Sequence, residues 1–465
     1  MNRRLQKPTT LSPHFSIYLC VFVFMLSAVA TPNATSADNP WPMFQHDPQH
    51  TGRGDHSGPQ SPVVKWTFPF GYEGAIGSPL VGADGTVYAP ITCGSTFHCG
   101  VLYAIDSVGN LKWHTPNFYE MGSATLGPDG TIYVSSANIY GALGLYALNP
   151  DGTTKWIYTP GFPYDRGPNL IVGSDGTIYG TAGFNWGIGH IFALNPDGTL
   201  KWKFSHDGYQ LLNLPTLGPD GTVYAAVTAD FIDTNVRLQA IDPNGNSKWA
   251  IWICCGFAAS VSTSSDGTIY LSTSFSLSAI KSDGTLLWSN VNGCYRCPTT
   301  PAIASDGTLI ASVMIGSGRG SIKAFNPDGT ERWIYPLNSG EIPLQPVIDS
   351  DGTIYVGVNS PPARLLALNT DGTLRWSSNV DQIIYSPLAL SASQTLYAAI
   401  QDISGLKLYA FGPSNLPPPG ACTLYRSSFP RFSHCHHRNL TGQDLHRPKY
   451  RRRNSHRECD YERRL

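Results

Sequence analysis

Short apolar runs recur along the chain, and most of them end at a turn that contains Asp-Gly or Asn-Gly. On both sides of these turns, Val, Ile, Leu or Tyr alternates with polar residues, which is the pattern of antiparallel strands with one buried face. In the motif Asn-Pro-Asp-Gly, as at residues 195–198, proline presets φ and glycine accepts the left-handed position of the turn. The pattern therefore predicts β-hairpins throughout the body of the chain.

Two hairpin motifs alternate with a regular period. The first is typified by "LIVGSDGTIY" and ends in a tyrosine marker: Tyr88, Tyr133, Tyr179, Tyr224, Tyr270, Tyr355 and Tyr397, with Leu309 in the remaining place. The second is typified by "NPDGTLKW" and ends in a tryptophan marker: Trp66, Trp113, Trp156, Trp202, Trp249, Trp288, Trp333 and Trp376. Successive tryptophan markers lie 39 to 47 residues apart. Two hairpins in each period give four antiparallel strands, the content of one propeller blade.

The order of the markers predicts how the ring closes. A tryptophan motif around Trp66 precedes every tyrosine motif, whereas the last tyrosine motif is followed by "LKLYAFG" without a final tryptophan strand. The N-terminal strand then completes the last blade and removes the exposed edges of the ring. We expect an all-β, eight-bladed β-propeller of four-stranded antiparallel blades, closed by an N-terminal strand, over residues 39–413.

The two ends of the chain differ from the repeats. Basic residues followed by the apolar run "FSIYLCVFVFMLSAVA" predict a signal peptide over residues 1–30, and this run is short for a bilayer-spanning helix. Secretion, or residence in the periplasm or cell envelope, without stable membrane insertion is the expectation. Residues 414–465 begin with a Pro-rich linker and continue as a basic segment without apolar periodicity, so disorder is expected there. The alternatives are a polyanion-binding tail and a C-terminal domain altered by a reading-frame error.

Composition narrows the classes of partner. The formal net charge is −1 and charged residues make up 14% of the chain, so nothing indicates nucleic-acid binding. Export favours disulfides, and six cysteines fall in close pairs within predicted loops. These disulfide candidates are Cys93 with Cys99, Cys254 with Cys255, and Cys294 with Cys297.

The spacing in "AIDSVGNLKW", at residues 104–113, resembles the tryptophan-docking repeat of the pyrroloquinoline quinone (PQQ)-like propeller family. The enzymes of that family usually carry Thr-Gly-Lys at the turn, where this chain has Asp-Gly-Thr. The resemblance implies the fold and specifies the activity poorly, because it also covers scaffolds and other proteins without enzymatic activity.

Strand order separates two faces of the predicted disc. The Asp-Gly turns share one face, here called the turn face, and the remaining loops share the opposite loop face, on which we expect function to lie. The loop face gathers aromatic and charged residues suited to a protein, peptide or glycan partner. Its ligand candidates are Glu73, Glu120, Asp165, Arg166, Trp186, Tyr209, Arg296 and Glu341.

A monomeric, exported binding or scaffold module is the favoured function, with no cofactor and no metal. The alternative is a PQQ-dependent alcohol or sugar dehydrogenase, in which the resemblance implies that a Cys254–Cys255 disulfide covers the quinone. That alternative also needs Ca²⁺ and an aspartate base, and no acid here matches those roles by motif. His46, Asp47, His50, Asp55 and His56 could hold a metal, but we expect an N-terminal strap pinned by Trp41 and Phe44.

Overall fold

The computed structural model describes residues 41–71, 74–93, 100–116, 118, 120–137, 143–159, 169–182, 189–206, 210–211, 214–228, 236–253, 260–290, 299–315, 318–360, 362–380 and 383–413. All regular structure within these ranges is β-strand, arranged as eight antiparallel sheets. The chain divides into Met1–Ser414 and Asn415–Leu465, and the described residues belong to the first unit. The predicted signal peptide, linker and tail lie outside them.

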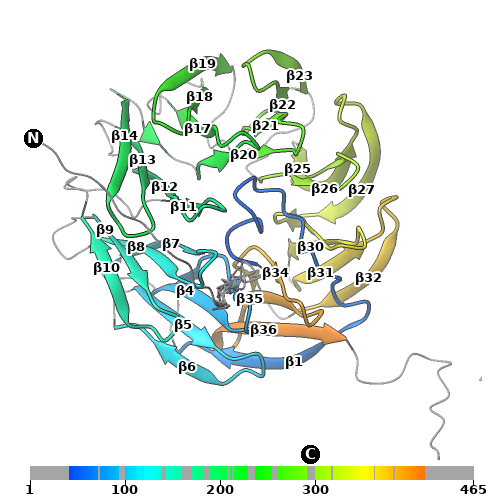
Figure 1. Cartoon of the computed structure of the whole chain (residues 1–465). Coiled ribbons are helices and arrows are strands. Elements are labelled where there is room, and N and C mark those ends of the chain that lie inside the picture. Colours follow the sequence, from blue (N-terminus) through cyan, green and yellow to red (C-terminus); the bar gives the residue numbers. More distant parts are fainter. Residues whose placement is uncertain are drawn as a thin grey trace, which may run out of the picture. The chain divides into compact units, whose positions relative to one another are not determined.

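The eight sheets are the blades of a propeller, with their outermost strands along the rim of the ring (Figure 1). Blade 1 contains β2 (Gly74–Ile76), β3 (Leu80–Val81), β4 (Val87–Cys93), β5 (Gly100–Ile105) and β6 (Leu111–His114). Blade 2 contains β7 (Glu120–Leu126), β8 (Ile132–Ala137), β9 (Leu143–Leu148) and β10 (Thr154–Tyr158). Blade 3 contains β11 (Asn169–Val172), β12 (Ile178–Ala182), β13 (Gly189–Leu194) and β14 (Leu200–His206). Blade 4 contains β15 (Gln210–Leu211), β16 (Thr216–Leu217), β17 (Val223–Thr228), β18 (Val236–Ile241) and β19 (Ser247–Ile253).

The second half of the ring repeats this plan. Blade 5 contains β20 (Ser260–Thr263), β21 (Ile269–Ser272), β22 (Leu277–Ile280) and β23 (Leu286–Asn290). Blade 6 contains β24 (Ala302–Ile303), β25 (Leu309–Ile315), β26 (Arg319–Phe325) and β27 (Glu331–Ser339). Blade 7 contains β28 (Ile342–Pro343), β29 (Val347–Ile348), β30 (Ile354–Asn359), β31 (Arg364–Leu368) and β32 (Leu374–Asn379). Blade 8 contains β33 (Ile383–Ile384), β34 (Ala389–Leu390), β35 (Leu396–Asp402), β36 (Gly405–Pro413) and the N-terminal β1 (Pro62–Pro69).

Burial follows the position of a strand in its blade. The third strands, such as β5 and β13, are buried at every position because neighbouring blades cover both of their faces. The outermost strands, such as β10 and β32, alternate exposed and half-buried residues because only one face is covered. This difference explains why some runs in the sequence are continuously apolar and others alternate.

The predicted closure of the ring is confirmed. β1 pairs antiparallel with β36, from Pro62 opposite Pro413 to Pro69 opposite Lys407, and so supplies the outermost strand of blade 8. Figure 1 shows the N-terminal strand beside the C-terminal one at the rim. The eight-bladed, all-β architecture expected from the repeat is therefore the observed fold.

All eight tryptophan markers join adjacent blades. Each indole Nε1 donates to a backbone carbonyl at the next junction, over 2.8 to 3.1 Å; the acceptors are Ser107, Pro150, Pro196, Pro243, Ser282, Pro327, Thr370 and Pro59. Seven of the acceptors belong to Gly-bearing turns. The eighth acceptor is Pro59, just before β1, because in blade 8 the two outer strands, β36 and β1, are not joined by a turn.

Residues 41–59, here called the strap, follow the inner ends of the blades across the middle of the ring (Figure 1). The backbone carbonyls of the strap accept hydrogen bonds from backbone N–H groups in the first strands of six blades. The donors are Val81, Leu126, Leu217, Thr263, Ile303 and Ile348. Trp41 and Met43 are buried in the core, whereas Phe44 is half-buried against the ring of His50. The expected strap is therefore present, with Met43 as its second buried apolar anchor.

Candidate functional site

Most of the predicted loop-face candidates cannot be placed. Glu73, Asp165, Arg166, Trp186, Tyr209 and Arg296 lie outside the described residues. Glu120 opens β7, where its backbone pairs with Ala137. Among the cysteines, Cys93 ends β4 opposite Gly74, and Cys99, Cys254, Cys255, Cys294 and Cys297 lie outside the described residues. The structure therefore leaves those predictions untested.

Glu341 is the loop-face candidate whose side chain is described, and it joins blade 6 to blade 7, because it lies between β27 and β28. Its carboxylate accepts hydrogen bonds from the backbone N–H of Asn338 at 2.7 Å and from Nη2 of Arg364 at 2.7 Å. Burial opposes ionisation, but these donors outweigh it and hold the pKa of Glu341 below its ordinary value. The side chain is 8% exposed, and its contacts hold the junction of blades 6 and 7.

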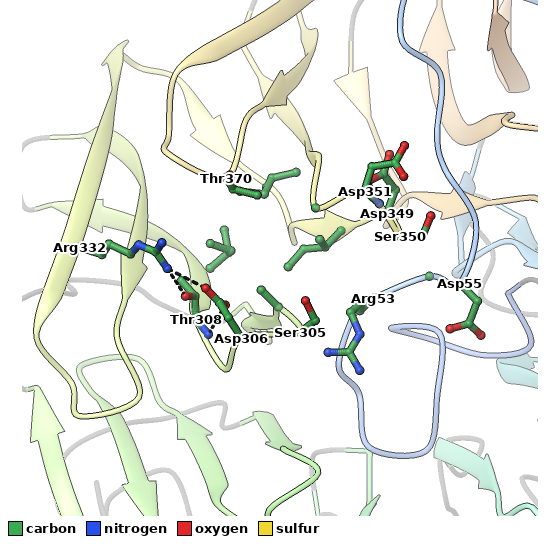
Figure 2. A pocket seen from close by; sticks show the side chains of 16 residues that line it. Arg53, Asp55, Ser305, Asp306, Thr308, Arg332, Asp349, Ser350, Asp351 and Thr370 are labelled. Carbon is green, nitrogen blue, oxygen red and sulfur yellow. Dashed lines mark hydrogen bonds and ion pairs between the residues drawn. The ribbon is translucent and has the colours of Figure 1, made fainter.

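A cleft of about 500 Å³ opens on the turn face between blades 6 and 7, beside the strap. Its volume is in the range of small-ligand and peptide side-chain sites. Figure 2 shows Arg332 and Asp306 at one side, and Arg53 and Asp55 at the other. The cleft therefore lies opposite the face on which the sequence predicts function.

Part of the cleft wall is held by internal contacts. Arg332 Nη1 donates to Asp306 at 2.9 Å and to Thr308 at 2.6 Å. The buried carboxylate of Asp349 accepts hydrogen bonds from the backbone of Gly58 at 2.8 Å and the hydroxyl of Tyr355 at 2.9 Å, as well as from backbone N–H groups of its own turn. These contacts fix the wall and attach the strap to blade 7.

A second set of charged residues at the cleft faces solvent. Asp351 is exposed, and the side chain of Asp55 is 68% exposed. Arg53 is half-buried, and its guanidinium donates one long hydrogen bond, 3.5 Å, to the carbonyl of Ile303. Within the described residues, Arg53 forms no ion pair with Asp55 or Asp351, so groups of both signs border one cleft. This arrangement favours a ligand that carries both charges.

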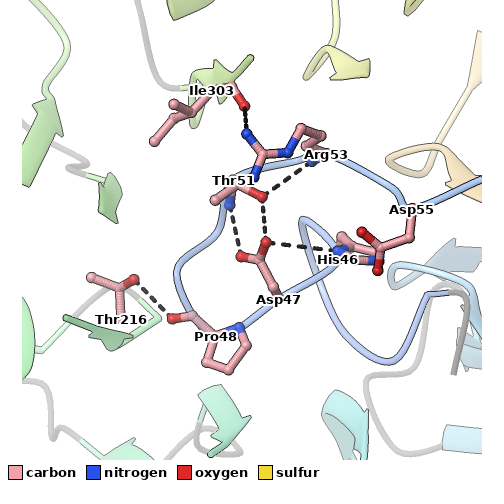
Figure 3. A network of polar contacts seen from close by, with 8 residues as sticks. All are labelled: His46, Asp47, Pro48, Thr51, Arg53, Asp55, Thr216 and Ile303. Atoms are coloured by element: carbon pink, nitrogen blue, oxygen red, sulfur yellow. Dashed lines mark hydrogen bonds and ion pairs between the residues drawn. The ribbon is translucent and has the colours of Figure 1, made fainter. Parts of the chain in front are cut away.

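The polar residues of the strap form a local network rather than a metal centre (Figure 3). Asp47 accepts hydrogen bonds from the backbone and the hydroxyl of Thr51, and His46 lies 3.6 Å from Asp47 and 3.7 Å from Asp55. His50 Nδ1 lies 3.1 Å from the carbonyl of Val261, and burial lowers the pKa of His50. No group of three His, Cys, Asp or Glu residues in the described ranges is placed to hold a metal ion.

A repeated polar contact runs around the turn face. In five blades, a Lys or Arg of the outermost strand lies within ion-pair distance of the turn aspartate of the same blade: Lys112–Asp84, Lys155–Asp129, Lys201–Asp175, Lys248–Asp220 and Arg332–Asp306. In blade 7, Arg375 donates to Thr353 at 2.7 Å. This contact was not predicted from the sequence, although a basic residue directly before Trp, together with Asp-x-Thr in the preceding hairpin, is its visible signal.

The site and fold can be compared with known proteins. No family model and no curated protein matches the chain. Sqt1 from Chaetomium thermophilum superimposes with a TM-score of 0.57 at 11% identity, over 76% of this chain and 100% of that one. The C-terminal WD40 domain of Sif2 superimposes with a TM-score of 0.56 at 11% identity, over 77% and 99%. At such identities the likeness shows a β-propeller fold alone.

In the described part of the chain, no helix is long and apolar enough to cross a membrane.

Proposed function

We propose that this chain is an exported binding module that recognises a segment of a partner polypeptide on its turn face, at the cleft between blades 6 and 7. The observation that supports it is the division of the cleft into an internally bonded wall and an exposed charged set. A rigid wall lowers the entropy cost of binding, and the exposed set remains available to a partner. Ile310, Ile348 and Ile354 form the buried apolar base of the cleft, since each is at most 2% exposed.

A polypeptide suits this cleft better than a neutral glycan. Arg53 offers planar N–H donors to a carboxylate or a main-chain carbonyl. Asp55 and Asp351 offer acceptors to a basic side chain or a main-chain N–H. A polypeptide carries all of these groups within a few ångströms, whereas a neutral glycan leaves the charges of both signs without counterparts. Export remains an expectation from residues 1–30.

The test is selection of peptides from a random library on the immobilised protein, followed by titration of labelled peptides against variants. Arg53→Gln and Asp351→Asn should each weaken binding about ten- to 150-fold, the effect of removing a charge-assisted hydrogen bond. Lys248→Gln, at the rim of blade 4, is the control and should leave affinity unchanged. Failure to enrich any peptide, or equal affinity in all variants, would reject the proposal.

A further inference from the structure

Blade 5 departs from the repeated contact of the turn face at one position. In every blade, the residue before the tryptophan marker occupies a β-bulge of the outermost strand, as shown by the register shifts beside Trp66, Trp113, Trp156, Trp202, Trp249, Trp288, Trp333 and Trp376. The bulge residue is Lys or Arg in seven blades and Leu287 in blade 5. The backbone at Leu287 is therefore built like the others, and only the side chain differs.

The equivalent blades show what this position holds when it is basic. In blades 1, 2 and 4, the lysine Nζ lies 3.0 to 3.1 Å from the turn carboxylate and 2.8 to 2.9 Å from the hydroxyl of the threonine two residues later. Blade 5 retains both acceptors, as Asp266 and Thr268. Within the described residues, no Lys, Arg or His lies within ion-pair distance of Asp266.

Asp266 keeps its negative charge although no cationic side chain of the described residues pairs with it. The hydroxyl of Ser264 and the backbone N–H of Thr268 donate to its Oδ1. The Ser264 hydrogen bond is the main reason that the pKa of Asp266 is lowered, so the carboxylate is ionised at neutral pH. Asp266 is exposed on the turn face, and Leu287 beside it is 46% exposed.

Asp266 also borders a cavity of about 340 Å³ between blades 4 and 5, which is lined by Pro219, Asp220, Tyr224, Asp266, Gly267 and Ser282. Among the described residues, Thr268 and Leu287 do not line this cavity, so the lysine position of blade 5 lies outside it. Asp220, the equivalent carboxylate of blade 4, is paired with Lys248 at 3.0 Å, so its charge is neutralised within the blade.

We propose that Asp266 and Thr268 form a receptor for a lysine side chain of a partner polypeptide, whose ammonium group takes the place that a lysine of the chain itself fills in blades 1, 2 and 4. The apolar flank of the partner then packs on Leu287. The inference deepens the proposed function, because it names a basic residue in the partner, but it concerns blade 5 and not the cleft beside Arg53.

The most informative variant restores in blade 5 the lysine that other blades carry at the same position. Leu287→Lys should fill the receptor from within the blade, as Lys248 does in blade 4, and so compete with the partner. Leu286→Lys is the matched control: it adds the same charge one position earlier, where Leu111, Leu200 and Leu374 of other blades are equally exposed. Both variants are expected to fold, since neither changes a buried residue.

The probe is the capped peptide acetyl-Gly-Leu-Lys-Leu-Gly-amide, coupled to the protein with a carbodiimide that joins a carboxylate to a nearby amine. Mass spectrometry should place the crosslink at Asp266 in excess over Asp220. Leu287→Lys should reduce the yield to the level of a norleucine peptide, whereas Leu286→Lys should retain it. In a titration by anisotropy, Asp266→Asn should weaken binding by up to about fivefold, the range of one exposed ion pair.

Equal crosslinking of Asp266 and Asp220, or an unchanged yield in Leu287→Lys, would overturn the inference. Arg53→Gln separates it from the proposed function. That variant should retain the lysine crosslink at Asp266 while it loses affinity for the peptides selected on the other cleft.

Discussion

At the scale of single residues, the ring depends on the contact of a tryptophan with a glycine. The turn glycines adopt positive φ, and a Cβ added to Gly329 would lie 2.6 Å from the ring of Trp288. Glycine is therefore required at this position for two reasons: the positive φ of the backbone and the close approach of the indole ring. The same double requirement holds at Gly152, Gly198 and Gly372.

Gly329→Ala should destabilise the protein by about 2 to 4 kcal/mol, because backbone strain adds to overpacking of the junction between blades 5 and 6. Gly318→Ala is the control, since Gly318 also has positive φ but no atom lies within 4 Å of its added Cβ. It should cost about 1 kcal/mol. Urea unfolding measures both, and equal costs would show that the indole contact contributes nothing.

At the scale of the hairpin, the turn aspartates link folding to acid pH. Burial opposes ionisation of Asp84 and Asp129, but hydrogen bonds from Thr86 and Thr131 and from the rim lysines hold the pKa of each carboxyl below its ordinary value. A lowered folded-state pKa stabilises the protein above the unfolded-state value, and this stabilisation is lost as pH falls through the folded-state value.

We therefore expect the urea midpoint to decline as pH falls below about 4, the ordinary range of aspartate. Asp84→Asn combined with Asp129→Asn should make that decline shallower and lower the midpoint slightly at neutral pH, because exposed ion pairs each contribute little. A pH profile identical to that of the unchanged protein would contradict this role of the two carboxylates.

The tyrosine markers link folding to alkaline pH with the opposite sign. Burial raises the pKa of Tyr88, Tyr133, Tyr224 and Tyr397 to about 12. Above a pH of about 10, the unfolded-state pKa, the unfolded chain loses these protons while the folded state still holds them. The free energy of unfolding should therefore fall as pH rises from about 10 through the folded-state pKa. The ultraviolet absorbance of tyrosinate should rise together with the loss of structure. Titration well before unfolding would contradict the burial of these phenols.

The features of a hairpin that could be predicted are those formed by residues close together in the sequence. The Asp-Gly turns and the alternation of each outermost strand are local signals, and both are confirmed. The rim pairs, such as Lys112 with Asp84, join residues 28 apart, so their geometry required the blade. Arg53 lies on the strap, 250 residues from Ile303, and no local pattern indicated that the two would meet.

At the scale of the whole molecule, the ring is closed by hydrogen bonds between the first strand of the propeller and its last two blades. The pairing of β1 with β36 and the indole bond from Trp376 to Pro59 both join the N-terminal segment to the C-terminal blades. This closure was predictable because the tryptophan marker precedes the first tyrosine marker. The strap path across six blades was not, since it rests on backbone carbonyls, which the side-chain pattern does not report.

Deleting the β1 residues 62–68 should therefore open the ring. Blade 8 would lose its outermost strand and expose the edge of β36, and an exposed edge promotes association. We expect a large drop in the unfolding midpoint and the appearance of oligomers in size-exclusion chromatography. Truncation after Pro413 is the control and should leave the midpoint nearly unchanged.

The central claim at this scale is that a partner polypeptide binds on the turn face. The most direct measurement is amide hydrogen exchange of the protein with and without a peptide selected on it. We expect protection at residues 53–55, 303–310 and 348–354, which border the cleft between blades 6 and 7. Protection confined instead to segments that the sequence predicts on the loop face, such as residues 254–259 and 291–298, would contradict it.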